Sequence, residues 1–285
     1  MSGAPYAPFL DARLGRPPGL SPLDPALWAT CDADFAAQAA GRDALLAAPD
    51  AETVAELPEA EPALAEFRAA LLAHLATRAD WRVDGAAVRR PDGAAVPLDA
   101  PTLELAGRAT QDDFLLLLPG ASEYRLVAGV LCFPSRWSLA QKLGRPLTDI
   151  HGPVPHYAEG LAARVNRVFA ALAPERPVWR ANWLAIATDA LRLVMREGER
   201  RRPPAALDRW WLRTERQTLV RLPRTGAVAF GIKTTVTPFE DLTPEQRRGL
   251  HAALSRWDEA EIDYRGGPVP HAAALAALVR LDRAA

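Results

Sequence analysis

The clearest pattern of apolar and polar positions lies in residues 210–236, where two strand-like runs flank a turn at 223–226. Successive strand side chains point to opposite faces, so Arg213 and Glu215 should share one face of the first run and Arg216 should lie on the other. Apolar runs at 113–118 and 124–133, separated by Pro119-Gly120, predict two paired and buried strands. A further strand is expected at 176–187.

Apolar positions at helical spacing predict helices at several places in the chain, namely 32–48, 60–79, 138–142, 156–172, 188–198, the stretch after Thr243, and 270–283. Thr243, Pro244 and Gln246 form a capping pattern. A small hairpin is expected between 81 and 98, and residues 1–27 predict an extended arm anchored by Trp28. The order of elements predicts an α+β fold in one domain, with an arm at 1–27, a core at about 80–242 and C-terminal helices at 243–285.

Composition narrows the class of protein. The 34 Lys plus Arg and 35 Asp plus Glu residues nearly cancel, so no global charge points to nucleic acid or to a membrane. With only Cys31 and Cys132, the chain has no covalent heme attachment motif, no cysteine set for an iron–sulfur cluster and no cysteine-based zinc site. Without a signal peptide or an 18-residue apolar stretch, a soluble cytoplasmic protein is expected.

Two stretches could carry chemistry, since hydrolase, Walker and dinucleotide-binding motifs are absent from the sequence. Residues 149–157, D-I-H-G-P-V-P-H-Y, contain His151 and His156 around two prolines that stiffen the backbone. This pattern is compatible with a structural turn before a helix, or with an imidazole held as an axial ligand to a metal or heme iron.

The second stretch is the charged run 213–217 inside a strong strand. Such residues are costly to bury unless they face water, pair with one another or bind a ligand. An exposed strand face would explain them, and so would a pocket wall in which Arg binds carboxylates and Glu binds a cationic substrate or relays protons.

Four motifs together resemble the heme-dependent oxidative N-demethylase family. They are F-P-S-R-W-S-L-A-Q-K-L-G-R-P-L from Phe133, I-H-G-P-V-P from Ile150, R-A-N-W from Arg180, and L-R-T-E-R-Q-T-L-V-R-L-P-R-T-G-A-V-A-F from Leu212. The similarity runs from about Pro8 to Leu242. It implies a heme b enzyme built on a PAS-like antiparallel sheet, flanked here by N- and C-terminal helices. Such an enzyme removes a methyl group from a small secondary amine of the dimethylamine type as formaldehyde, using O₂ and electrons from NADPH through a separate flavin/iron–sulfur reductase.

The resemblance also implies roles for individual residues. His151 is the first choice for the iron ligand, with His156 as the rival, and Glu215 would hold the protonated amine near the iron. Candidates to pair with the two propionates are Lys142, Arg213, Arg216 and Arg221. Candidates to cover the ring are Trp183, Phe230 and Ile232. Two other functions stay open, a non-catalytic heme-binding PAS-like sensor or carrier and a heme-free small-molecule binding domain.

Overall fold

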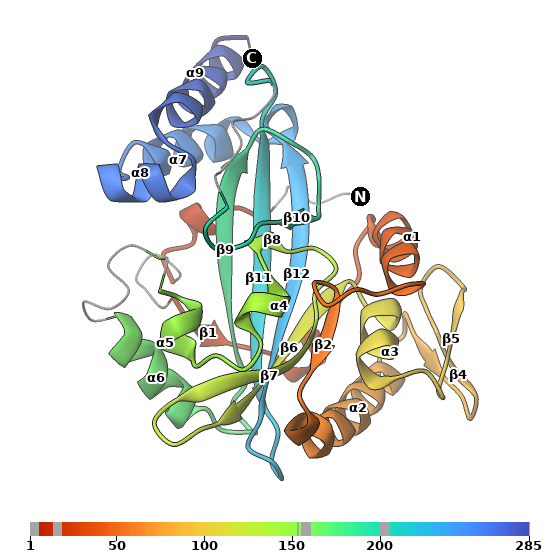
Figure 1. Ribbon diagram of the computed structural model, residues 1–285. Coiled ribbons are helices and arrows are strands. Elements are labelled where there is room, and N and C mark those ends of the chain that lie inside the picture. Colours follow the sequence, from red (N-terminus) through yellow and green to blue (C-terminus); the bar gives the residue numbers. More distant parts are fainter. Residues whose placement is uncertain (1–5, 14–18, 153, 155–160, 200–205, 285) are drawn as a thin grey trace.

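The centre of the protein is a seven-stranded antiparallel sheet, seen in a computed structural model that describes residues 6–13, 19–152, 154, 161–199 and 206–284 (Figure 1). Across the sheet the strands are β1 (Ser21–Pro22), β9 (Val178–Ile186), β11 (Trp211–Arg221), β12 (Val228–Pro238), β6 (Asp112–Pro119), β7 (Tyr124–Val130) and β2 (Val54–Glu56). Both edge strands therefore come from the first 56 residues, and the strands between them come from the rest of the chain.

The predicted strands are confirmed, and the β11–β12 hairpin is the longest of their pairings. Its register runs without a break from Trp211 opposite Pro238 to Arg221 opposite Val228. Gly226 makes the turn possible because its φ is +70°, a conformation that costs glycine little. The other predicted pair, β6 and β7, shows one register shift between Leu116 and Leu117.

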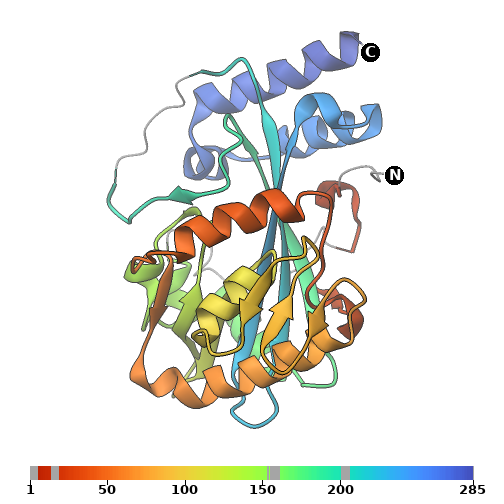
Figure 2. The ribbon, with the colours of Figure 1, turned by 90° about the vertical axis from the view of Figure 1, so that its right-hand side faces the viewer.

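One face of the sheet is covered by helices from the N-terminal part of the chain, α1 (Phe35–Leu46), α2 (Glu61–Ala76) and α3 (Thr102–Ala109) (Figure 2). We call it the α2 face. Phe67 of α2 meets Phe114 of β6 with ring centroids 5.0 Å apart, and the buried Trp28 packs edge-on against both rings. Trp28 therefore anchors the N-terminal segment, as predicted, whereas α3 was not predicted.

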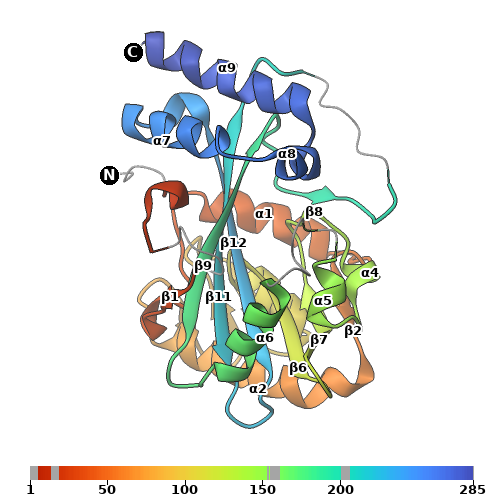
Figure 3. The same cartoon turned by 90° about the vertical axis from the view of Figure 1, so that its left-hand side faces the viewer.

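The opposite face, which we call the α5 face, is covered by α4 (Leu139–Lys142), α5 (Leu147–Ile150) and α6 (Ala162–Ala171) (Figure 3). Leu147 and Ile150 of α5 join a buried cluster with Leu115 of β6, against which Phe230 of β12 packs. The Ser138 hydroxyl accepts from the Gln141 N–H and caps α4, whose place agrees with the helix predicted at 138–142. The predicted beginning of the helix at 156 lies outside the described residues.

A helical cap closes the upper ends of β9, β11 and β12 with α7 (Pro244–Leu254), α8 (Glu259–Arg265) and α9 (Pro268–Ala284) (Figure 1). The Thr243–Gln246 capping box is present, as predicted. Short 3₁₀ helices occupy Pro8–Leu10, Pro25–Leu27, Pro58–Ala60 and Phe239–Asp241. The mixed arrangement of helices and an antiparallel sheet confirms the expected α+β class. Within the described ranges, no helix has the length and apolarity needed to cross a membrane.

The predicted helix at 188–198 is wrong. Residues Leu193–Val194 form β10, which pairs in parallel with β8 (Ser135–Trp137). Arg192 donates to the carbonyls of Leu131 and Cys132 at 3.3 and 3.2 Å, and these tertiary bonds outweigh local helix propensity. The expected hairpin between 81 and 98 is confirmed within a small sheet of β3 (Arg82–Val83), β4 (Ala87–Arg89) and β5 (Ala95–Pro97).

Candidate functional site

His151 lies at the C-terminal end of α5, on the α5 face of the sheet. The Leu147 carbonyl accepts two hydrogen bonds from it, one from the backbone N–H at 3.1 Å and one from Nδ1 of the ring at 2.9 Å. A carbonyl oxygen only accepts, so Nδ1 carries the ring proton and the lone pair is on Nε2. This arrangement fixes both the tautomer and the direction of the imidazole, as is typical of metal-binding histidines.

The imidazole of His151 is held in its neutral form. Burial lowers the pKa of His151, and the nearby positive charges of Arg180 and Lys142 lower it further, against the opposing effect of the bond to Leu147. A neutral imidazole is the form that binds a metal. The end of α5 therefore presents a nitrogen donor at neutral pH.

Polar side chains of β9 and β11 share the α5 face with His151. The strand register places Arg180 of β9 beside Gln217 of β11, and the next row places Asn182 beside Glu215. Although β9 is an inner strand, Arg180 and Asn182 remain partly exposed. The sheet surface at this point is therefore polar and incompletely covered, which suits the wall of a binding site.

Arg180 is a functional candidate that the sequence prediction of individual site residues missed. Its Nε is buried and has no hydrogen-bond partner in the part of the chain that the structure describes. Burial lowers the pKa of Arg180, while the negative charge of Glu215 acts in the opposite direction. A guanidinium group in this position is suited to an incoming carboxylate. The only sequence signal was its place in the R-A-N-W motif.

Glu215 is held in a fixed orientation by its own strand. Its two carboxylate oxygens accept from Nε of Arg213 at 3.2 Å and from Nε2 of Gln217 at 3.1 Å. Arg213 is fully buried, and its remaining nitrogens donate to the carbonyls of Leu191 at 2.8 Å and Phe133 at 2.7 Å. Arg213 thus orients Glu215 and does not present its nitrogens to an external anion.

The remaining predicted residues do not all meet at His151. Lys142 donates to the Ile150 carbonyl at 2.9 Å and pairs with Glu197, and Arg221 donates to the Leu172 carbonyl at 2.9 Å. Phe230 and Ile232 pack against the same cluster as Ile150. On the opposite, α2 face, Arg216 bonds the carbonyls of Leu27 and Trp28, and the ring of Trp183 stacks on Trp257 at 5.5 Å. His156, Pro153 and Pro155 lie outside the described residues.

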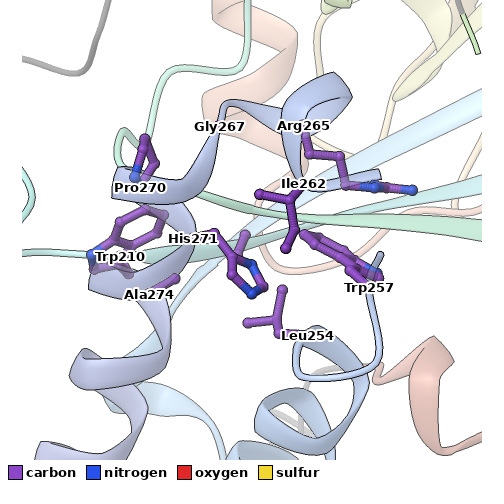
Figure 4. Close-up of a pocket in the computed structure, with 10 residues that line it drawn as sticks. Trp210, Leu254, Trp257, Ile262, Arg265, Gly267, Pro270, His271 and Ala274 are labelled. Atoms are coloured by element: carbon purple, nitrogen blue, oxygen red, sulfur yellow. The ribbon is translucent and has the colours of Figure 1, made fainter. Parts of the chain in front are cut away.

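A small hollow lies in the helical cap, away from His151 (Figure 4). Trp257 and His271 stack there at 5.6 Å, and the cavity of about 20 Å³ has room for about one water molecule. No group of three or more His, Cys, Asp or Glu side chains able to hold a metal occurs within the described ranges.

A protein-family model described as "Haem-dependent oxidative N-demethylase, alpha subunit-like" matches residues 19–275. The chain belongs to this family. The match contains all four motifs noted in the sequence, and the predicted resemblance is therefore confirmed.

In this member of the heme-dependent oxidative N-demethylase alpha subunit-like family, the α5 face has groups that fit a heme. His151 provides an oriented imidazole, and the Nε of Arg180, which has no partner within the described ranges, suits a propionate. Phe230 and Ile232 add apolar surface of the kind that lies against a porphyrin. A porphyrin supplies four ligands of its own, so a single histidine from the protein is enough to attach its iron.

Proposed function

We propose that the chain binds heme b through His151 and removes a methyl group from a small secondary N-methyl amine as formaldehyde. The family description supports heme dependence and oxidative N-demethylation. One atom of O₂ ends in formaldehyde and the other in water, while two protons and two electrons are consumed. The electrons come from NADPH through a separate reductase. The observation that carries the proposal is the imidazole of His151, oriented by the Leu147 carbonyl near the polar rows of β9 and β11.

The protein residues have separate roles in this proposal. Bound heme supplies the activation of O₂ at its iron. His151 would hold the heme iron through its neutral Nε2, and Arg180 would bind a propionate through its guanidinium group. Phe230 and Ile232 would help to keep water away from the bound heme.

Glu215 is proposed to bind the protonated amine. A carboxylate has about four lone-pair sites, and Arg213 and Gln217 donate one hydrogen bond each, so acceptor capacity for an ammonium group remains. The side chain is already oriented by these two bonds, so little conformational entropy is lost when the substrate binds. A propionate bound by Arg180 would neutralise the second guanidinium near this carboxylate.

We further infer that the fold is PAS-like and that residues 1–285 form one domain. The antiparallel sheet carries helices on both faces, and the residues proposed to hold the ligand lie on its α5 face. The arm contributes β1 to the same sheet, which supports a single unit.

The test is the absorption spectrum of the protein after reconstitution with hemin, recorded in the ferric state and after dithionite reduction under CO. We expect a Soret band that shifts with CO in the wild type and in His156→Ala. The band should be lost or strongly weakened in His151→Ala, and free imidazole should restore it in His151→Gly. Formaldehyde release from N-methyl amines, with NADPH and a reductase, then measures turnover.

Three other outcomes of these measurements would contradict part or all of the proposal. If the band survives in His151→Ala and is lost in His156→Ala, the ligand assignment is wrong. A band without formaldehyde release would favour a heme sensor or carrier. A wild-type protein that stays colourless with hemin would leave only a heme-free binding domain.

A further inference from the structure

Helix α5 is too short to be stable by itself. It has four residues, Leu147–Ile150, about one turn, whereas isolated helices need roughly 12–15 residues before they are even marginally stable in water. The buried Leu147 and Ile150 attach it to the core, but two apolar side chains do not define the direction of the helix end. The polar contacts at its two ends supply that direction.

At the N-terminal end, the Glu123 carboxylate caps the helix. Its Oε2 accepts from the backbone N–H of Thr148 at 2.8 Å and from the Thr148 hydroxyl at 2.9 Å. A negative group at a helix N-terminus satisfies donors that have no partner within the helix. Glu123 comes from the turn between β6 and β7, so this end of α5 is fixed to the central sheet.

At the C-terminal end, Lys142 performs the complementary role. Its Nζ donates to the Ile150 carbonyl at 2.9 Å, which places a positive group against the unsatisfied carbonyls of the last turn. The Lys142 side chain is only 3% exposed, and a lysine buried this deeply needs a charged partner. That partner is Glu197.

Glu197 extends the contact to a distant part of the chain. It pairs with Lys142 and with Arg145, the latter at 2.8 Å, and its backbone N–H donates to the side chain of Gln141 at 2.6 Å. Glu197 follows β10, so the segment after β10 is joined to α4 and, through Lys142, to the end of α5. The Glu197 side chain is 34% exposed, so it can be altered without opening the core.

His151 depends directly on this geometry. The Leu147 carbonyl that orients its Nδ1 belongs to α5, and the Ile150 carbonyl bound by Lys142 belongs to the residue immediately before His151. A tilt of α5 would therefore rotate the imidazole and lengthen its bond to Leu147. We infer that Glu123, Lys142 and Glu197 are positioning residues that hold α5 at both ends and thereby set the direction of the His151 imidazole. The inference rests on the proposed role of His151 as the iron ligand.

The experiment compares four variants with the hemin-reconstituted wild type. Lys142→Met removes the contact with Ile150, Lys142→Arg keeps the charge, and Glu197→Gln and Glu123→Gln weaken the two ends separately. Glu59→Gln is the matched control, because Glu59 also pairs with an arginine, Arg125 at 2.6 Å, but on the exposed surface. The measurements are the iron–histidine stretching band of the reduced protein by resonance Raman spectroscopy, the rate of heme loss to excess apomyoglobin, and the melting temperature.

We expect Lys142→Met to shift or broaden the iron–histidine band and to weaken heme binding by about 10- to 100-fold, the usual effect of removing a group that orients a metal ligand. Glu197→Gln and Glu123→Gln should change the band in the same sense by less, Lys142→Arg should restore it, and Glu59→Gln should leave it unchanged. A lower melting temperature with an unchanged band and rate of heme loss in Lys142→Met would overturn the inference. If that variant does not fold, unchanged bands in Glu197→Gln and Glu123→Gln would overturn it.

Failure of the proposed function has a different signature. In that case the wild type shows no heme band, or the band persists in His151→Ala, before any of the positioning variants is compared.

Discussion

Charged residues lie on both faces of the sheet around β11, and the two faces differ in whether the chain provides partners for their cations. On the α2 face, Arg216 bonds the carbonyls of Leu27 and Trp28, and Lys233 beside it pairs with Asp32 at 2.9 Å. The N-terminal segment therefore satisfies the cations of this face. On the α5 face, the Nε of Arg180 has no partner among the described residues.

The difference teaches that a charged strand position does not by itself identify a binding site. The same alternation puts Arg216 on one face and Glu215 on the other, and Glu215 is buried whereas Arg216 is half-buried. What separates them is the covering segment, because residues 27–32 supply carbonyls and a carboxylate to one face only. A cation that its own chain leaves unpartnered is the better candidate for binding a ligand.

The largest change in stability is expected for Asp112→Asn, a substitution on the α2 face. Burial raises the pKa of Asp112 from 3.8 to about 6, and neither carboxylate oxygen has a partner within the described part of the chain. The protonated carboxyl makes its full contribution to the free energy of unfolding below about pH 4. This contribution is lost as the pH rises through about 6, because the buried carboxyl must then ionise. The loss is about 3 kcal/mol at 1.36 kcal/mol per pKa unit. Urea unfolding of Asp112→Asn should therefore show up to about 3 kcal/mol of extra stability at pH 8 and no difference at pH 4.

Equal stabilities of wild type and Asp112→Asn at both pH values would show that the carboxylate is solvated or paired in solution. Asp32→Asn is the control, because the pKa of Asp32 is lowered, with hydrogen bonding from Gln111 and the charge of Lys233 outweighing partial burial. Its favourable contribution is lost as the pH falls. Asp32→Asn should therefore destabilise the protein at pH 8.

A smaller change in the free energy of unfolding is expected for Arg216→Met, which tests whether Arg216 differs in role from Arg180. Arg216→Met should lower the free energy of unfolding by about 2 kcal/mol, since charged hydrogen bonds contribute about 1.5–3 kcal/mol. It should leave heme affinity unchanged, because Arg216 lies on the α2 face. Urea unfolding and heme titration of the same preparation measure both quantities. Weakened heme binding at constant stability would show that Arg216 serves the heme site, and the proposed difference between the two faces would be wrong.

The smallest change in stability is expected for Arg180→Met. The buried Nε of Arg180 has no partner among the described residues, so replacing the side chain removes little hydrogen bonding and relieves a desolvation cost. The free energy of unfolding should therefore stay within about 1 kcal/mol of the wild type or rise. Heme should bind more weakly, and Arg180→Lys should recover part of the loss. A clear loss of stability with normal heme binding would place Arg180 among the structural cations, together with Arg216.

Local patterns predicted much of this arrangement. Period-two alternation correctly separated Arg216 from Arg213 and Glu215, and turn and capping residues located the β11–β12 hairpin and α7. The helix expected at 188–198 failed because Arg192 bonds carbonyls about 60 residues away. Arg180 was not chosen because a missing partner is a property of the folded chain, and no local pattern reports it.

The placement of the edge strands has a consequence for how the molecule assembles during synthesis. Ser21–Pro22 lies against β9, so the first strand of the sheet to be made waits for residues 178–179 before it can pair. The opposite edge at Val54–Glu56 waits only for 128–130. The edge strand β2 can therefore pair early in synthesis, whereas β1 can pair only after more than half of the protein has been synthesised. Until β1 pairs, the outer edge of β9 has backbone groups that another chain could bind. Docking of the N-terminal segment on β9 therefore protects the protein against aggregation.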